Sequence, residues 1–190
     1  TSISLANRNP GDNAEVHLTV TDPALNIDPT TADIWAFSLA ADGTPPSVIF
    51  ANNGTGNTAL IAIELGQHDC SANCRLSSDS QTGIVAGGAS ALTLVTVTET
   101  GASTDVFESF DINGVGQWKT IDGAVKNGQI IYSYGGNTAD QIITYTDATI
   151  SMDAGGDWAP GQTATITVVD AEANRNPTSA ETLNAYDETV

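Results

Sequence analysis

Basic side chains are scarce in this sequence: five Lys and Arg residues face 23 Asp and Glu residues in a chain of 190, for a formal net charge of -18. A protein that binds nucleic acid or an anionic membrane surface needs basic residues to neutralise phosphates. The composition therefore argues against both partners. Such an excess of negative charge repels itself within a compact fold, and either high salt or bound divalent cations would relieve it. Many of the acids cluster in turns, which favours cations.

Long apolar runs are absent as well. No stretch of about 18 or more apolar residues occurs, so the sequence predicts no helix that spans a membrane. The chain has no initiator Met and no signal-peptide pattern. It begins at Thr1 in strand-like sequence, as expected of a processed or excised product.

Cysteine is limited to two closely spaced residues, Cys70 and Cys74. A structural zinc site needs about four ligands, and the nearby acids and His68 make an unconvincing set. A disulfide between the two cysteines is the favoured interpretation, and it implies an oxidising exterior. Asn53, in Asn-Gly-Thr, is a candidate N-glycosylation site and indicates the same compartment.

Known catalytic motifs are also missing. The sequence has no Gly-x-Ser-x-Gly elbow, no phosphate-binding glycine loop and no His pair at metal-binding spacing. His17 alternates with apolar Val16 and Leu18, so we expect it to face solvent on a strand. His68 and Asp69 have no nucleophile nearby in the sequence. We therefore predict that the protein is not an enzyme, although a spatial pair of carboxylates for glycosidic cleavage stays open.

Strand signals dominate what is present. Apolar alternation predicts strands over residues 14–21 and 33–39, and a hairpin formed by residues 129–134 and 141–146. Strands recur about every ten residues with turn residues between them, which predicts an all-β fold in the form of an antiparallel β-sandwich.

An internal repeat organises the chain. The segment that follows the second predicted strand returns at an offset of 148, and its second copy contains Val168, Asp170, Asn174, Asn176, Pro177, Ala180 and Glu181. We therefore predict a sandwich over residues 1–148, with a cysteine-containing excursion at 66–88. Residues 149–190 are predicted to be a partial second repeat. The partial repeat has about three strands, which bury too little apolar surface to be stable alone. This segment should therefore pack on the first domain or on another copy of the molecule.

The repeated loop carries the side-chain oxygens that calcium prefers. In the first copy they belong to Asp22, Asn26, Asp28 and Asp33. The alternative is that these residues cap turns by accepting hydrogen bonds from their own backbone. In the second copy the candidates are Asp170, Asn174 and Glu181. Weaker binding is expected there, because Asn176 replaces Asp28.

Several motifs together resemble the immunoglobulin-like repeats of archaeal and bacterial surface-layer and extracellular filament proteins. They are Pro10-Gly11, the V-x-L-x-V-x-D-P-x-x-N-x-D-P run that starts at Val16, the E-T-G-x-S-T-D-V-F run that starts at Glu99, and Tyr145-Thr146-Asp147. The likeness covers most of residues 1–150 and the partial copy. It implies an immunoglobulin-like antiparallel β-sandwich and an exterior structural role, often with calcium. The cysteine excursion departs from this pattern.

Two functions follow. The first is a structural extracellular protein that self-assembles head-to-tail into a filament or surface layer and is stabilised by calcium. In it, Ile150, Ile166 and Val168 would hold copies of the molecule together by strand addition. The alternative is a carbohydrate-binding or adhesive module of a larger cell-surface protein, with glycans as partners and Trp35, Trp118 and Trp158 as candidates for stacking on sugars.

Overall fold

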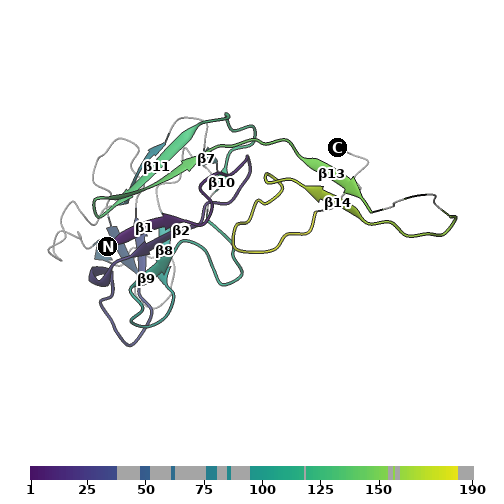
Figure 1. Ribbon diagram of the computed structural model, residues 1–190. Coiled ribbons are helices and arrows are strands. Elements are labelled where there is room, and N and C mark those ends of the chain that lie inside the picture. Colours follow the sequence, from purple (N-terminus) through teal and green to yellow (C-terminus); the bar gives the residue numbers. More distant parts are fainter. Residues whose placement is uncertain are drawn as a thin grey trace.

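The computed structural model describes residues 1–37, 48–51, 61–62, 76–80, 85–86, 95–117, 119–153, 156 and 159–183. In this part of the chain the regular structure is almost entirely β (Figure 1). The strands are β1 (Ser2–Leu5), β2 (Leu18–Thr21), β3 (Ile34–Phe37), β4 (Val48–Ala51), β5 (Ile61–Ala62), β6 (Leu76–Ser80), β7 (Val85–Ala86), β8 (Val95–Glu99), β9 (Val106–Glu108), β10 (Lys119–Thr120), β11 (Gln129–Tyr134), β12 (Asn137–Ile142), β13 (Thr149–Met152) and β14 (Ile166–Val169). One 3-10 turn, η1, covers Pro23–Leu25.

The strands of the described residues form four antiparallel sheets. The largest has seven strands in the order β1-β2-β9-β8-β3-β4-β5, and a second has three in the order β12-β11-β6. Two small sheets pair β10 with β7 and β13 with β14. The predicted all-β, antiparallel class is confirmed.

One hydrophobic core joins the two larger sheets. In β2 the side chains alternate, with Leu18 and Val20 fully buried and Thr19 and Thr21 partly exposed, as expected of a strand with one face on a core. The same cluster contains residues of both sheets and of the segments between strands: Ile3, Val16, Leu18, Val20, Leu25, Trp35, Val97, Phe107, Ala124, Ile130, Tyr132, Tyr134, Ala139 and Ile143. The indole N–H of Trp35 donates to the Leu25 carbonyl at 2.7 Å, which ties the loop after β2 to the core.

Two strand predictions need correction. Strand β2 begins only at Leu18, and of the preceding predicted residues Glu15 makes a single bridge to Lys119. The strand after β11 is 137–142 rather than 141–146. Gly135 and Gly136 both have positive φ, 57° and 79°, so a two-residue turn leads directly into β12.

His17 is also placed differently from the prediction. Its exposed fraction is 1%, and its ring stacks on Phe110 with centroids 4.5 Å apart. The residue lies just before β2, where strand alternation does not yet apply, and a later part of the chain covers it.

The last described segment is residues 149–183, which we call the tail; residues 1–146 are the body. The β13–β14 hairpin of the tail extends away from the body, and the chain after the hairpin turns back to it (Figure 1). In the described part of the chain, no helix is long and apolar enough to cross a membrane. Asn53, Cys70, Cys74, Trp118 and Trp158 lie outside the described residues.

Candidate functional site

The tail hairpin has the same strand register as the first hairpin of the body. In β1–β2, Ile3 is paired with Val20 and Leu5 with Leu18. In β13–β14, Ile150 is paired with Val168 and Met152 with Ile166. Directly opposed residues point to the same side of a sheet. Each hairpin therefore places four apolar side chains on one face.

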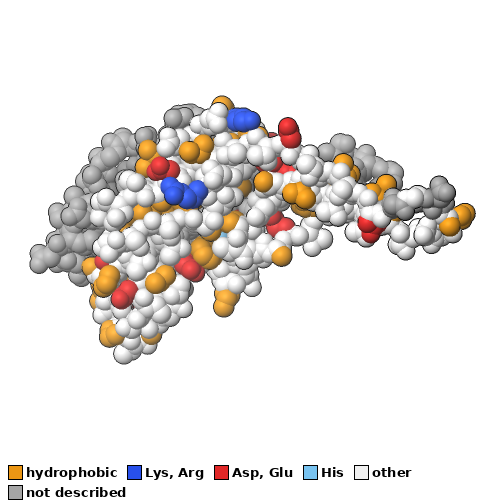
Figure 2. Space-filling view, in the orientation of Figure 1, with side chains coloured by type: hydrophobic (Ala, Val, Ile, Leu, Met, Phe, Trp, Pro, Cys, Tyr) orange, Lys and Arg blue, Asp and Glu red, His pale blue; other side chains and the backbone are white. Residues whose placement is uncertain are grey.

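The two faces differ sharply in burial. The exposed fractions of Ile3, Leu18 and Val20 are 8%, 0% and 0%, whereas those of their tail counterparts Ile150, Ile166 and Val168 are 74%, 61% and 60%. Hydrophobic side chains are visible along the projecting tail in Figure 2. The three predicted assembly residues thus share one exposed face, and Met152 is a fourth member that sequence reasoning missed.

Within the described ranges, the strands that cover the first hairpin have no counterpart over the second. Strand β9 pairs with β2 and places Phe107 opposite Val20, while β11 adds Tyr132 and Tyr134 to the same core. Among the described residues, β14 pairs with β13 alone. Full burial of one such apolar side chain stabilises a protein by about 1.5–3 kcal/mol. The exposed apolar side chains of the tail hairpin lack this stabilisation.

The first acidic loop, residues 22–33, is held together by its own carboxylates. The Oδ1 atom of Asp22 accepts from the Ala24 N–H at 3.1 Å and caps η1. Asp33 Oδ2 accepts from the N–H groups of Ile27 and Asp28 at 2.6 and 3.0 Å. These are the turn-capping contacts that were the alternative to calcium binding.

Asp28 and Asp22 are directed to different partners. Asp28 Oδ1 accepts from the N–H and hydroxyl of Thr30, and this hydroxyl bond is the main reason that the pKa of Asp28 lies below its usual range. Asp22 is buried, and its Oδ2 accepts from the Tyr134 hydroxyl at 2.8 Å. Burial is the main reason that the pKa of the Tyr134 phenol is raised, with the Asp22 bond adding to it.

Two oxygens in the loop are buried without a hydrogen-bond partner: Asp33 Oδ1 and Asn26 Oδ1. Two further acids lie against them. The Glu99 carboxylate accepts from the Asp33 N–H at 3.2 Å, and Asp105 Oδ1 accepts from the Asn26 amide at 2.9 Å. Sequence reasoning missed both acids as members of this site, although they belong to the E-T-G-x-S-T-D run.

The donor set fits calcium only in part. Calcium takes six to eight oxygen ligands. The described residues contain no group of three or more His, Cys, Asp or Glu side chains arranged to hold a metal ion. Asn26 and Asp33 would supply side-chain oxygens, and the remaining ligands would have to be backbone carbonyls, water or a rotated carboxylate.

The second acidic loop, residues 170–181, repeats the bonds of the first. Asp170 Oδ1 accepts from the Glu172 N–H, as Asp22 does from Ala24. Glu181 accepts from the Arg175 N–H, as Asp33 does from Ile27. The Asn174 N–H donates to the Ala171 carbonyl, as that of Asn26 does to Pro23. Each residue named in the second loop lies 148 positions after its counterpart in the first loop.

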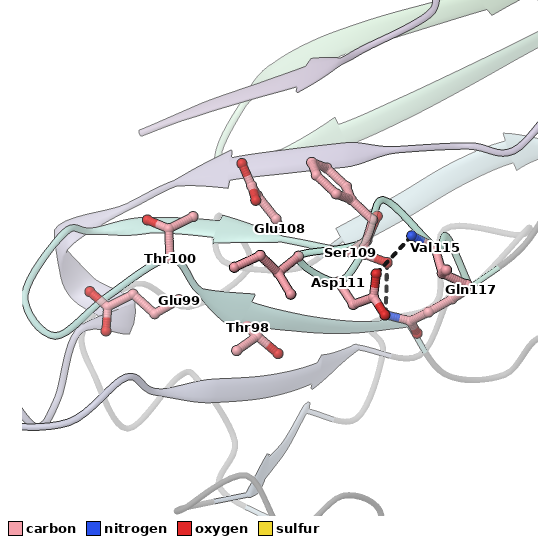
Figure 3. A pocket seen from close by; sticks show the side chains of 10 residues that line it. Thr98, Glu99, Thr100, Glu108, Ser109, Asp111, Val115 and Gln117 are labelled. Atoms are coloured by element: carbon pink, nitrogen blue, oxygen red, sulfur yellow. Dashed lines mark hydrogen bonds between the residues drawn. The ribbon is translucent and has the colours of Figure 1, made fainter. Parts of the chain in front are cut away.

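A groove lies beside the ends of β8 and β9 (Figure 3). Its volume is about 520 Å³, and its walls include Glu99, Glu108, Asp111 and Gln117. Asp111 accepts from the Val115 N–H at 2.8 Å, which is the main cause of the lowered pKa of that carboxyl. The Gln117 amide bonds to the backbone of Thr96 and Ser109. These side chains therefore build the local fold.

Comparison with known proteins places the chain in no established family. No protein-family model matches it, and no curated protein matches it.

Proposed function

We propose that this is a structural, non-enzymatic extracellular protein that assembles head-to-tail through its tail hairpin into a filament or surface layer. One observation carries the proposal. Ile150, Ile166 and Val168 occupy register positions whose counterparts in β1–β2 are buried, yet they are exposed to solvent. An exposed apolar face does not stabilise a monomer, whereas burying it in an interface would stabilise an assembly.

The mode of binding would be strand addition. Strand β14 has an edge that corresponds to the edge of β2 where β9 pairs. A strand from another copy of the molecule would supply backbone bonds there, and the alternating side chains would fix its register. The tail of one copy would meet the body of the next, which is a heterologous contact. Such contacts propagate into filaments unless their rotation closes a ring.

The same proposal includes the type of fold. An immunoglobulin-like sandwich over the body, followed by a second repeat, is supported by the core shared between the two larger sheets. It is also supported by the equal registers of β1–β2 and β13–β14 and by the repeated loop bonds. The sequence resemblance to surface-layer and filament repeats agrees with this reading.

Calcium is the proposed stabiliser. The loops at residues 22–33 and 99–105 together carry Asp22, Asp28, Asp33, Glu99 and Asp105, and neither contains Lys or Arg. Their negative charges repel one another. A cation bound by the unpartnered oxygens of Asn26 and Asp33 would offset this repulsion and hold the two loops together.

Assembly can be tested with two substitutions in one strand. Val168→Glu places a charge on the apolar face of β14. Thr167→Glu places the same charge on the opposite face, because neighbouring strand residues point to opposite sides. Both positions are exposed, so the monomer should fold in either variant.

Sedimentation velocity and negative-stain electron microscopy over a range of concentrations provide the measurement. We expect the unsubstituted chain and Thr167→Glu to form extended assemblies, and Val168→Glu to remain monomeric. Assembly by Val168→Glu, or a monomeric unsubstituted chain at every concentration, would contradict the proposal.

A further inference from the structure

The second acidic loop is seated against one end of the body. The Glu15 N–H donates to the Arg175 carbonyl at 2.7 Å, and the Asn176 side-chain amide donates to the Gly114 carbonyl at 2.6 Å. The Glu172 carboxylate accepts from the backbone N–H of Thr146. We call this contact the joint, and the body residues 11–17 and 114–116 its socket.

Two socket glycines allow close approach. A Cβ atom on Gly114 would lie 2.7 Å from Thr178 Oγ1, and one on Gly11 would lie 2.8 Å from Glu172 Cγ. Real Cβ atoms are essentially never found at such distances, so a larger residue at either position would force Thr178 or Glu172 to move.

His17 forms the floor of the socket. Its Nε2 atom bonds Glu15 Oε2 at 2.9 Å, and its Nδ1 atom lies 3.0 Å from the Thr178 hydroxyl. Glu15 Oε2 also accepts from the Gly116 N–H at 2.7 Å. The imidazole is thus held on one side by the body and contacts the loop on the other.

The first acidic loop has the same backbone scaffold but lacks the side chains that make the joint. Ala24 stands at the position of Glu172 and has no carboxylate to accept from an N–H. Asp28 stands at the position of Asn176, and a carboxylate cannot donate to a carbonyl. The Arg175 guanidinium, 4.0 Å from Asp12 and half exposed, adds little to this difference.

We propose that the socket is a specific docking surface for the acidic loop of the following repeat, and that Glu172 and Asn176 select this loop over its copy at residues 22–33. The joint would hold the tail hairpin in one direction relative to the body. If the proposed head-to-tail assembly holds, the same selection keeps the first loop of a neighbouring copy out of the socket and so preserves the order of repeats.

A matched pair of exchanges tests the selection in the full chain. Asn176→Asp gives the second loop the residue of the first, and Asp28→Asn makes the reverse change where no socket is present. The readout is amide hydrogen exchange of Glu15 and Thr146, whose N–H groups donate across the joint. It is measured at a concentration at which the protein is monomeric, so the result does not depend on assembly.

We expect both amides to exchange roughly tenfold faster in Asn176→Asp, because a donor is lost and a carboxylate faces a carbonyl. In Asp28→Asn they should exchange as in the unsubstituted chain, and β2 amides should be unchanged in both variants. Unchanged exchange of Glu15 and Thr146 in Asn176→Asp would overturn the proposal.

A second pair of variants distinguishes the effect of a steric clash at the joint from the effect of backbone strain. Gly114 has φ +75° and Gly136 has φ +79°, but a Cβ on Gly136 would meet nothing within 4 Å. Alanine therefore costs similar strain at both positions. We expect Gly114→Ala to release the two joint amides and Gly136→Ala to leave them protected. Equal release in both variants would overturn the proposal, since strain alone would then explain it.

Discussion

Val168 occupies in β14 the register position that Val20 occupies in β2. Each is paired with an isoleucine of the preceding strand, Ile150 and Ile3 respectively. The exposed fraction is 0% for Val20 and 60% for Val168. The same side chain in the same local structure is therefore a core residue in one hairpin and a surface residue in the other. The difference lies in the strands that cover it.

The first prediction compares alanine at the two positions. Val20→Ala removes buried methyl groups and should lower the free energy of unfolding by about 1.5–3 kcal/mol. Val168→Ala should change that quantity in the monomer by about 0.5 kcal/mol or less. Urea unfolding at low concentration measures both. Equal losses in the two variants would mean that the tail face is covered within the monomer.

The second prediction concerns the hydroxyl of Tyr134, which donates to Asp22 inside the core. Tyr134→Phe takes one donor from a buried carboxylate and should destabilise the fold by about 1–3 kcal/mol near neutral pH. The raised pKa of the phenol adds a pH signature. The folded state keeps this proton above pH 10, where an unfolded tyrosine loses it, so this part of the stability is lost as the pH rises.

The destabilisation caused by Tyr134→Phe should therefore shrink above pH 10, by about 1.4 kcal/mol per pH unit. Urea unfolding of both chains between pH 7 and pH 11 measures it. A pH-independent difference between Tyr134→Phe and the unsubstituted chain would show that the phenol ionises as freely in the folded state as in the unfolded one.

The loop geometry could be predicted from the repeat because like side chains at a constant offset make like bonds. Asp22 and Asp170 each cap the turn that follows them. His17 could not be predicted in the same way. The residues that bury His17 include Thr178, which is 161 positions away in the sequence. Alternation along one strand carries no information about such a distant partner.

Glu99 and Asp105 show the same limit at the acidic site. Their sequence run is conspicuous, but their contacts with Asp33 and Asn26 span 66 and 79 residues. These contacts depend on β8 lying beside β3 and on β9 lying beside β2. Periodicity predicts strands and faces, and it does not predict the order of strands in a sheet.

The third prediction is that calcium raises the thermal midpoint through Asp33 and Asn26. At a concentration about 100 times the dissociation constant, one saturated site stabilises the folded state by roughly 2.7 kcal/mol. Asp33→Asn should remove this increment, since it takes the charge from the unpartnered buried oxygen. Asp28→Asn should keep most of it, because the Asp28 carboxylate is bonded to Thr30.

Thermal melts in excess chelator and in millimolar calcium measure the increment for each variant. The increment is compared rather than the midpoint, because Asp33 also holds two loop N–H groups and its substitution destabilises the chain by itself. A midpoint that calcium leaves unchanged in the unsubstituted chain would remove calcium from the proposed function.

The fourth prediction is that acid opens the joint through Glu172. The Thr146 N–H donates to this carboxylate, and this bond is the main reason that its pKa lies below the ordinary value of 4.5. A lowered pKa means that the docked loop favours the ionised form. The contribution of Glu172 to docking is therefore fully present above pH 4.5, and it is lost as the pH falls through the lowered pKa of the docked state.

The chemical shift of the Thr146 amide proton, followed by NMR from pH 7 down to pH 2, reports this protonation directly. In the unsubstituted chain we expect the shift to titrate with a midpoint below 4.5. Glu172→Gln keeps an oxygen acceptor but cannot titrate, so its Thr146 shift should stay constant over the same range. Asp12 lies at the same joint, 4.0 Å from the Arg175 guanidinium, and is present in both chains. A titration of Thr146 that survives Glu172→Gln would therefore assign the acid response to a neighbouring group such as Asp12, and the lowered pKa of Glu172 would have no part in holding the tail.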